Sequence, residues 1–170
     1  MHFLLIGTYH HVHVRQDNSV QAEMDGLETI MRDVIRDQAP DAIIEEMSEV
    51  AMKLRNGTST IPGELAREFN LRHAMVDPTP AQRDEAGIET EQAIEIEAFQ
   101  RSLPRQVVAE RIAEANRRRE RYWLDRIAAL EAERILFVCG AAHVNAFGDL
   151  ARGVGHSVEV VNPDWPPGVY

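Results

Sequence analysis

Short apolar runs alternate along the chain with longer segments in which apolar residues have helical spacing. The runs at residues 3–6, 41–46 and 135–139 predict buried strands, and weaker runs at 71–76 and 157–161 predict two more. Between the first two runs, residues 20–38 carry apolar side chains at the 3.6-residue period of an amphipathic helix. The order strand, helix, strand is typical of a right-handed βαβ unit with parallel strands.

The rest of the chain predicts further helices around this unit. Apolar spacing and helix terminators place them at about residues 47–55, 62–70, 89–100, 104–133 and 143–152. The polar segments 9–18 and 81–88 are expected to be irregular, and residues 162–167 an extended tail. The pattern therefore predicts a single α/β domain over residues 1–170. Its mostly parallel central sheet has about five strands, flanked by helices that include one long helix before the closing strands.

Composition narrows the class of protein. The chain has 170 residues, 44% of them hydrophobic, which is typical of a globular domain, and its net charge of −10 argues against a nucleic-acid partner. No apolar run approaches the roughly 20 residues of a membrane helix, and residues 1–8 lack the basic start of a signal peptide. We therefore expect a cytoplasmic protein without a membrane partner. Cys139 is the only cysteine, which excludes an intrachain disulfide, and its place in an apolar strand predicts a packing role.

A Gly-x-x-His pattern occurs twice, each time after a predicted strand. Residues 7–10 read Gly-Thr-Tyr-His, and residues 140–143 read Gly-Ala-Ala-His. Parallel strands collect ligands at their carboxyl ends, so His10 and His143 would share one crevice if their strands are neighbours. A neutral imidazole there suits a metal ion or a general base equally well.

Two acidic positions and one arginine are candidates for the same crevice. Glu45 and Glu46 end a predicted strand and point to opposite faces, so one is expected near the crevice and the other toward a helix layer. Carboxylates at such positions are also common in helix caps and salt bridges. Asp77 follows the next strand at the same sheet edge, although an aspartate before a proline is often a turn former. Arg119 lies four residues before Trp123 in an apolar stripe, and a buried arginine needs an anionic partner.

These motifs resemble those of the TraB/Tiki-type proteins and their relatives, the ChaN-like haem-uptake proteins and the erythromycin-esterase-like hydrolases. The family pattern Gly-Thr-x-His matches residues 7–10, Pro-Asp-apolar-Glu matches residues 40–46, and Gly-Ala-x-His matches residues 140–143. The family glutamate falls on Glu46, or on Glu45 with a slip of one residue, and a family aspartate corresponds to Asp77. A helical Arg-Asn-x-x-Met-Ala motif corresponds to residues 119–124, where Glu120 and Trp123 replace the asparagine and the methionine.

The resemblance implies a hydrolase that cleaves an ester or amide bond with an activated water. Tiki members are metal-dependent proteases, esterase-like members open a lactone with histidine and glutamate, and ChaN-like members bind haem. In a metal version, His10, Glu46 and His143 hold a divalent ion such as Mn, Co or Zn. In a metal-free version, His10 or His143 is the general base and Glu46 orients it. Arg119 is expected to stabilise the developing oxyanion in both.

The other expectations concern the substrate and the alternatives to catalysis. Tyr9, His13, Glu45 and Asp77 are expected to contact a small-molecule or peptide substrate. The main alternative is a non-catalytic protein that binds haem, a metal or a small ligand, with a homodimer formed through the long helix. A third interpretation is a structural protein whose histidines complete a polar core.

Overall fold

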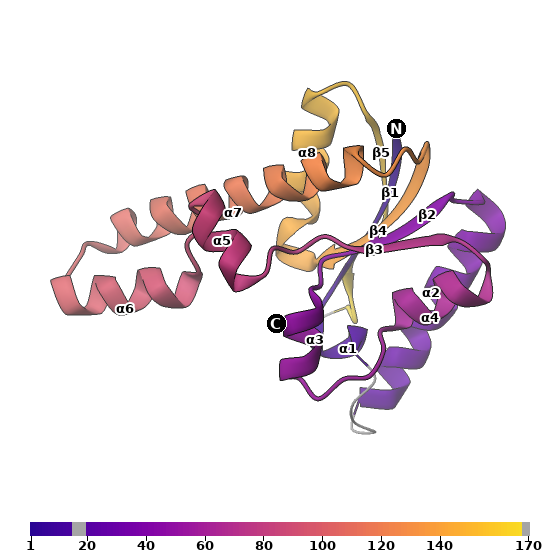
Figure 1. Ribbon diagram of the computed structural model, residues 1–170, viewed down its shortest axis with the longest axis horizontal. Helices are drawn as coiled ribbons and strands as arrows, with labels where there is room; N and C mark the ends of the chain where they lie inside the picture. The colour runs from indigo at the N-terminus through magenta and orange to yellow at the C-terminus, as the bar shows by residue number, and fades with distance from the viewer. Residues whose placement is uncertain (15–19, 168–170) are drawn as a thin grey trace.

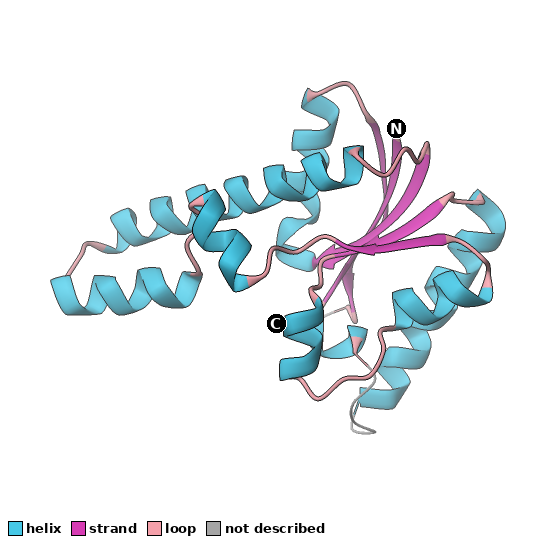
Figure 2. Cartoon of the chain, viewed as in Figure 1, coloured by secondary structure: helices cyan, strands magenta, loops and turns pink. Residues whose placement is uncertain are grey.

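The fold is a five-stranded parallel sheet covered by helices on both faces, in a computed structural model that describes residues 1–14 and 20–167 (Figure 2). The side chains of His10 and His11 also lie outside the described part. The strand order is β3-β2-β4-β1-β5, and every neighbouring pair is parallel. The predicted α/β architecture is therefore confirmed. The strands are β1 (His2–Thr8), β2 (Ala42–Glu45), β3 (Arg72–Met75), β4 (Arg134–Gly140) and β5 (Ser157–Trp165).

The helices in chain order are α1 (His10–His13), α2 (Gln21–Gln38), α3 (Glu49–Leu54), α4 (Ile61–Glu68), α5 (Pro80–Ala86), α6 (Glu91–Arg101), α7 (Arg105–Ala128) and α8 (Val144–Gly153), with a short 3₁₀ turn η2 (Ala141–His143). Helices α2 and α4 cover one face of the sheet, and α8 and the second half of α7 cover the other (Figure 1). In β1, Phe3 and Leu5 pack toward α7 and α8, whereas Leu4 and Ile6 pack toward α2 and α4. Strands buried on both faces read as the continuous apolar runs seen in the sequence. Within the described chain, none of the helices combines the length and apolar character needed to cross a membrane.

The strand order opens a crevice between β1 and β4. From β1 the chain crosses through α2 to β2, on one face of the sheet, and from β4 it crosses through α8 to β5, on the other face. These two crossovers leave neighbouring strands in opposite directions along the sheet. Such a reversal separates the loops that follow the strands, and ligands bind at that point in open α/β sheets.

Residues 81–88 differ from the prediction, because helix α5 replaces the expected irregular segment. Thr79 and Gln82 form a reciprocal capping box, and Pro80 occupies the first turn. Gly87 ends the helix with a left-handed φ of 63°. These signals are local and outweigh the polar composition of the segment.

Three other boundaries also differ from the prediction. Within the expected loop at residues 9–18, one helical turn forms α1. The sequence also predicts Asn18 or Ser19 as the cap of α2, and both lie outside the described residues. Helix α7 ends at Ala128 rather than near residue 133. Strand β5 continues to Trp165, with register shifts against β1, where an extended tail was expected.

Helices α6 and α7 form an antiparallel hairpin whose outer part projects away from the sheet (Figure 1). The second half of α7 returns over the sheet, where Trp123, Leu124 and Ile127 join the core. One end of this long helix therefore stands in solvent. Its middle brings Arg119 to the carboxyl ends of the strands, and its other end lies near their amino ends, where β4 begins.

Gly7 is the position in β1 that tolerates a side chain least. A methyl group there would overlap the backbone oxygen of Pro163 and the side chain of Val144. We expect Gly7→Ala to lower the free energy of unfolding by about 1–3 kcal/mol or more, because a backbone oxygen cannot move aside cheaply. Gly153→Ala is the control, since nothing lies within 4 Å of its added methyl group, and should change stability by less than about 0.5 kcal/mol. Urea unfolding measures both, and equal stability of the two variants would contradict this packing.

Candidate functional site

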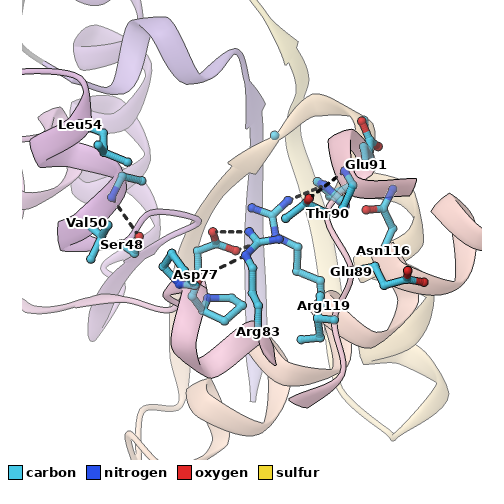
Figure 3. A pocket seen from close by; sticks show the side chains of 18 of the residues that line it. Ser48, Val50, Leu54, Asp77, Arg83, Glu89, Thr90, Glu91, Asn116 and Arg119 are labelled. Atoms are coloured by element: carbon cyan, nitrogen blue, oxygen red, sulfur yellow. Dashed lines mark hydrogen bonds and ion pairs between the residues drawn. The ribbon is translucent and has the colours of Figure 1, made fainter. Parts of the chain in front are cut away.

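A pocket of about 900 Å³ opens at the carboxyl ends of β1 and β4. One wall is α3, which presents the apolar side chains of Val50 and Leu54 (Figure 3). The facing wall is polar and is formed by residues 89–91 and by Asn116 of α7. Between the walls lie the charged side chains of Asp77, Arg83 and Arg119, and the turn after β4 contributes Gly140, Ala141, Ala142 and His143.

Arg119 is the centre of the charged group. Its Nε donates to Asp77 Oδ1 at 2.6 Å, and its Nη2 lies 2.7 Å from Glu46 Oε1. Its guanidinium also stacks over the ring of Trp123 at 4.9 Å. The side chain is only 16% exposed, and burial alone would lower its pKa, but the charge of Glu46 and the hydrogen bond to Asp77 outweigh burial and raise that pKa. Arg119 therefore stays charged at the floor of the pocket.

Asp77 has both carboxylate oxygens occupied. Oδ1 accepts from Trp123 Nε1 at 3.0 Å in addition to Arg119, and Oδ2 accepts from Arg83 at 2.9 Å. The carboxylate is nearly buried and lines the pocket. Its contacts indicate that Asp77 positions two guanidinium groups, and the direct substrate contact expected from the sequence stays a prediction.

Glu46 joins the end of β2 to the turn after β4. Its Oε2 accepts from the backbone N–H of Gly140 at 2.6 Å, and its side chain is fully buried. Glu45 lies on the opposite face, where its Oε1 accepts from Thr60 at 2.6 Å and contacts His73 Nε2 at 2.7 Å. The expected alternation is observed, and Glu46 is the glutamate on the side of Arg119.

His143 lies between two charged neighbours on α7. Its Nδ1 is 2.8 Å from Glu120 Oε1, and its Nε2 is 3.5 Å from Arg119 Nη1. A carboxylate only accepts hydrogen bonds and a guanidinium only donates them. The two partners therefore assign the same neutral tautomer, with the proton on Nδ1 and the lone pair on Nε2. The edge of the Trp123 ring packs against the imidazole at 5.0 Å and restricts its orientation.

Glu120 and Arg83 belong to the site, although neither was predicted there. Glu120 precedes Trp123, Leu124 and Ile127 by three, four and seven residues, which places it in the buried stripe of α7. A glutamate in the apolar stripe of a helix predicts a buried carboxylate with a partner inside the protein, so the sequence contained a signal for Glu120. Arg83 follows a turn in a polar segment, where the sequence offers no comparable signal.

Of the other predicted site residues, some line the pocket and others do not. Tyr9 lines the pocket, whereas Glu45 and His13 are fully buried and neither lines it. The backbone of His10 begins α1 directly after β1, but its side chain lies outside the described residues. Cys139 is buried in the core, and burial, together with the charges of Glu46 and Glu120, raises the pKa of its thiol well above the usual range.

Two of the three predicted metal ligands face a cation instead. Glu46 Oε1 and His143 Nε2 are 3.9 Å apart, and the Arg119 guanidinium lies within 2.7 Å of the first and 3.5 Å of the second. Among the side chains that the structure describes, no three histidine, cysteine or acidic groups are placed to hold a metal ion. A dication between Glu46 and His143 would be repelled by Arg119. These two donors do not fit the predicted metal site, and the third, His10, is outside the described side chains.

Comparison with known proteins adds no family to this description. A scan against known protein families finds no match to the chain, and searches among curated proteins and among solved structures find no similar protein. The resemblance to the TraB/Tiki-type proteins therefore stays a prediction based on the motifs.

Removal of the Arg119 charge tests the electrostatics of the site. In Arg119→Met, the buried carboxylate of Glu46 loses its cation, whereas Asp77 keeps its pair with Arg83, so we expect a loss of about 3–5 kcal/mol in the free energy of unfolding at pH 7.5. The loss should shrink as the pH falls toward 5, because a buried carboxylate without a cation takes up a proton more readily in the folded state than in the unfolded state.

Arg118→Met is the matched control, since Arg118 is exposed on the same helix and pairs with Glu114 at the surface. It should change stability by less than about 0.5 kcal/mol at either pH. Urea unfolding at pH 7.5 and pH 5 measures both variants. A pH-independent loss for Arg119→Met would indicate lost packing rather than uncompensated charge.

Proposed function

We propose that the pocket hydrolyses an ester or amide bond with a water molecule that His143 activates, without a metal ion between Glu46 and His143. The observation that carries the proposal is the pairing of His143 Nδ1 with Glu120 at 2.8 Å in a residue that lines the pocket. A carboxylate in this position fixes the imidazole and stabilises its protonated form. The resemblance to metal-independent, esterase-like hydrolases supports the same chemistry.

In the proposed reaction, His143 is the general base. Its Nε2 exchanges the long 3.5 Å contact with Arg119 for a water molecule and takes a proton from it, while the water oxygen attacks the carbonyl carbon and the carbonyl electrons move onto the carbonyl oxygen. Collapse of the tetrahedral intermediate breaks the bond to the leaving group, which receives the proton from Nε2. Glu120 stabilises the imidazolium between these two steps.

Arg119 is the proposed oxyanion partner. A guanidinium has five N–H groups, and Arg119 directs three of its N–H donors at Asp77, Glu46 and His143. The remaining two can donate to a substrate oxygen in the pocket. The charge is already fixed by buried carboxylates, so little reorganisation is needed when negative charge develops.

The walls of the pocket favour a substrate with an apolar part. Val50 and Leu54 of α3 form an apolar surface beside the charged floor, and Ile88 also lines the pocket. A volume of about 900 Å³ lies within the range of pockets that bind small molecules. The pocket therefore suits a small molecule or a short peptide whose apolar group lies against α3 while its carbonyl reaches Arg119.

A second candidate function is the binding of a small anionic ligand without catalysis. Arg83 and Arg119 lie side by side at the floor of a partly apolar pocket, and such an arrangement also suits a carboxylate ligand. Among the described side chains that line the pocket, the only imidazole is that of His143, and it already faces Glu120 and Arg119. This arrangement favours a carboxylate ligand over haem.

Hydrolysis of a panel of aryl esters and fluorogenic peptides tests the proposal. We expect activity that survives dialysis against EDTA, and a loss of about 10²–10⁴-fold in kcat for His143→Ala. Glu120→Gln should lower kcat by about 10²-fold or more, because an amide can reverse the tautomer of His143.

Glu114→Gln is the control, because Glu114 is on the same helix but pairs with exposed arginines. It should keep the wild-type rate. Full activity in both His143→Ala and Glu120→Gln would contradict the proposal. Activity lost in EDTA and restored by a divalent metal would favour the metal version instead. Tight binding of a carboxylate without any turnover would favour the second candidate function.

A further inference from the structure

The hairpin of α6 and α7 leaves an apolar face of α6 uncovered. Only Ile94 and Ala98 of this 11-residue helix are buried, and within the described chain α6 packs mainly against α7. Phe99 is 88% exposed and Ile96 is 50% exposed. Both belong to a hairpin that projects from the sheet and is remote from its core (Figure 1).

Phe99 and Ile96 lie on one face because they are three residues apart in a helix. A short helix in water depends on the burial of an apolar face, and α6 buries little of its surface against α7. An exposed phenylalanine and isoleucine on one turn therefore indicate that another surface covers this face.

We propose that the partner is a second copy of this chain, whose hairpin packs antiparallel on the first around a two-fold axis near Phe99. Two such hairpins form a four-helix arrangement in which each outer face of α6 is covered. The two-fold axis requires one patch to be complementary to itself, and the opposite charges that precede and follow Phe99 along the hairpin, Glu95 and Arg105, meet that requirement.

Glu95 lies one turn from Phe99 toward the base of the hairpin, and Arg105 lies beyond the loop toward its tip. Neither side chain makes an ion pair with any residue that the structure describes. An antiparallel arrangement around Phe99 sets Glu95 of one copy against the Arg105 end of the other, and the symmetry repeats this pair. A parallel arrangement would instead bring like charges together.

The size of the face indicates a weak dimer. Helix α6 is about 16 Å long, and a stable interface covers about 800 Å² on each partner. The outer face of one short helix and its loop lies at or below this size. We therefore expect a dimer that dissociates in the micromolar range, with a mass that depends on concentration.

Sedimentation velocity between about 5 and 500 μM tests the proposal. The wild-type mass should rise from 19.2 kDa toward twice that value with increasing concentration. Phe99→Glu should remain a monomer throughout, with an unchanged circular dichroism spectrum, because the exposed side chain makes no core contact. Val154→Glu is the control, since Val154 is 48% exposed next to α8, and it should dimerise like the wild type.

A charge swap distinguishes a second copy from any other partner. Glu95→Arg and Arg105→Glu should each weaken the dimer by about tenfold, because each change turns two attractive pairs into repulsive ones. The double variant should recover wild-type dimerisation. A wild-type chain that stays monomeric at about 500 μM, a dimer that persists in Phe99→Glu, or a double variant that is no stronger than the single ones would overturn the proposal.

Discussion

The site depends on one buried guanidinium that joins the ends of three strands. Arg119 reaches from α7 to Glu46 after β2, to Asp77 after β3 and to His143 after β4. A buried charge is costly unless it is paired, and each partner here is nearly buried as well. The second half of α7 lies over the sheet and so brings Arg119 to the strand ends.

Glu120, the next residue after Arg119, helps to fix which nitrogen of His143 carries the proton. Arg119 and Glu120 are consecutive residues of one helix, and they contact opposite nitrogens of the same imidazole. A donor on one side and an acceptor on the other favour a single neutral tautomer of His143. Trp123 holds Arg119 and His143 in place, because its ring stacks on the first and packs against the second. Its Nε1 also donates to Asp77.

The sequence could predict the features that repeat along the chain. The apolar runs placed the strands, and the alternation of side chains in β2 separated Glu45 from Glu46. The apolar stripe of α7 identified Arg119 as a buried cation with an acidic partner. Glu120, Arg83 and the contact of one guanidinium with both Glu46 and His143 could not be predicted in the same way. They depend on which side chains meet across segments far apart in the sequence.

The tautomer of His143 is the most direct test of this account. A long-range ¹H–¹⁵N NMR spectrum of the imidazoles at pH 8 reports it, and comparison with His143→Ala assigns the signal. We expect a proton on Nδ1 and a lone pair on Nε2, as Glu120 and Arg119 require. A proton on Nε2 with the lone pair on Nδ1 would contradict this arrangement.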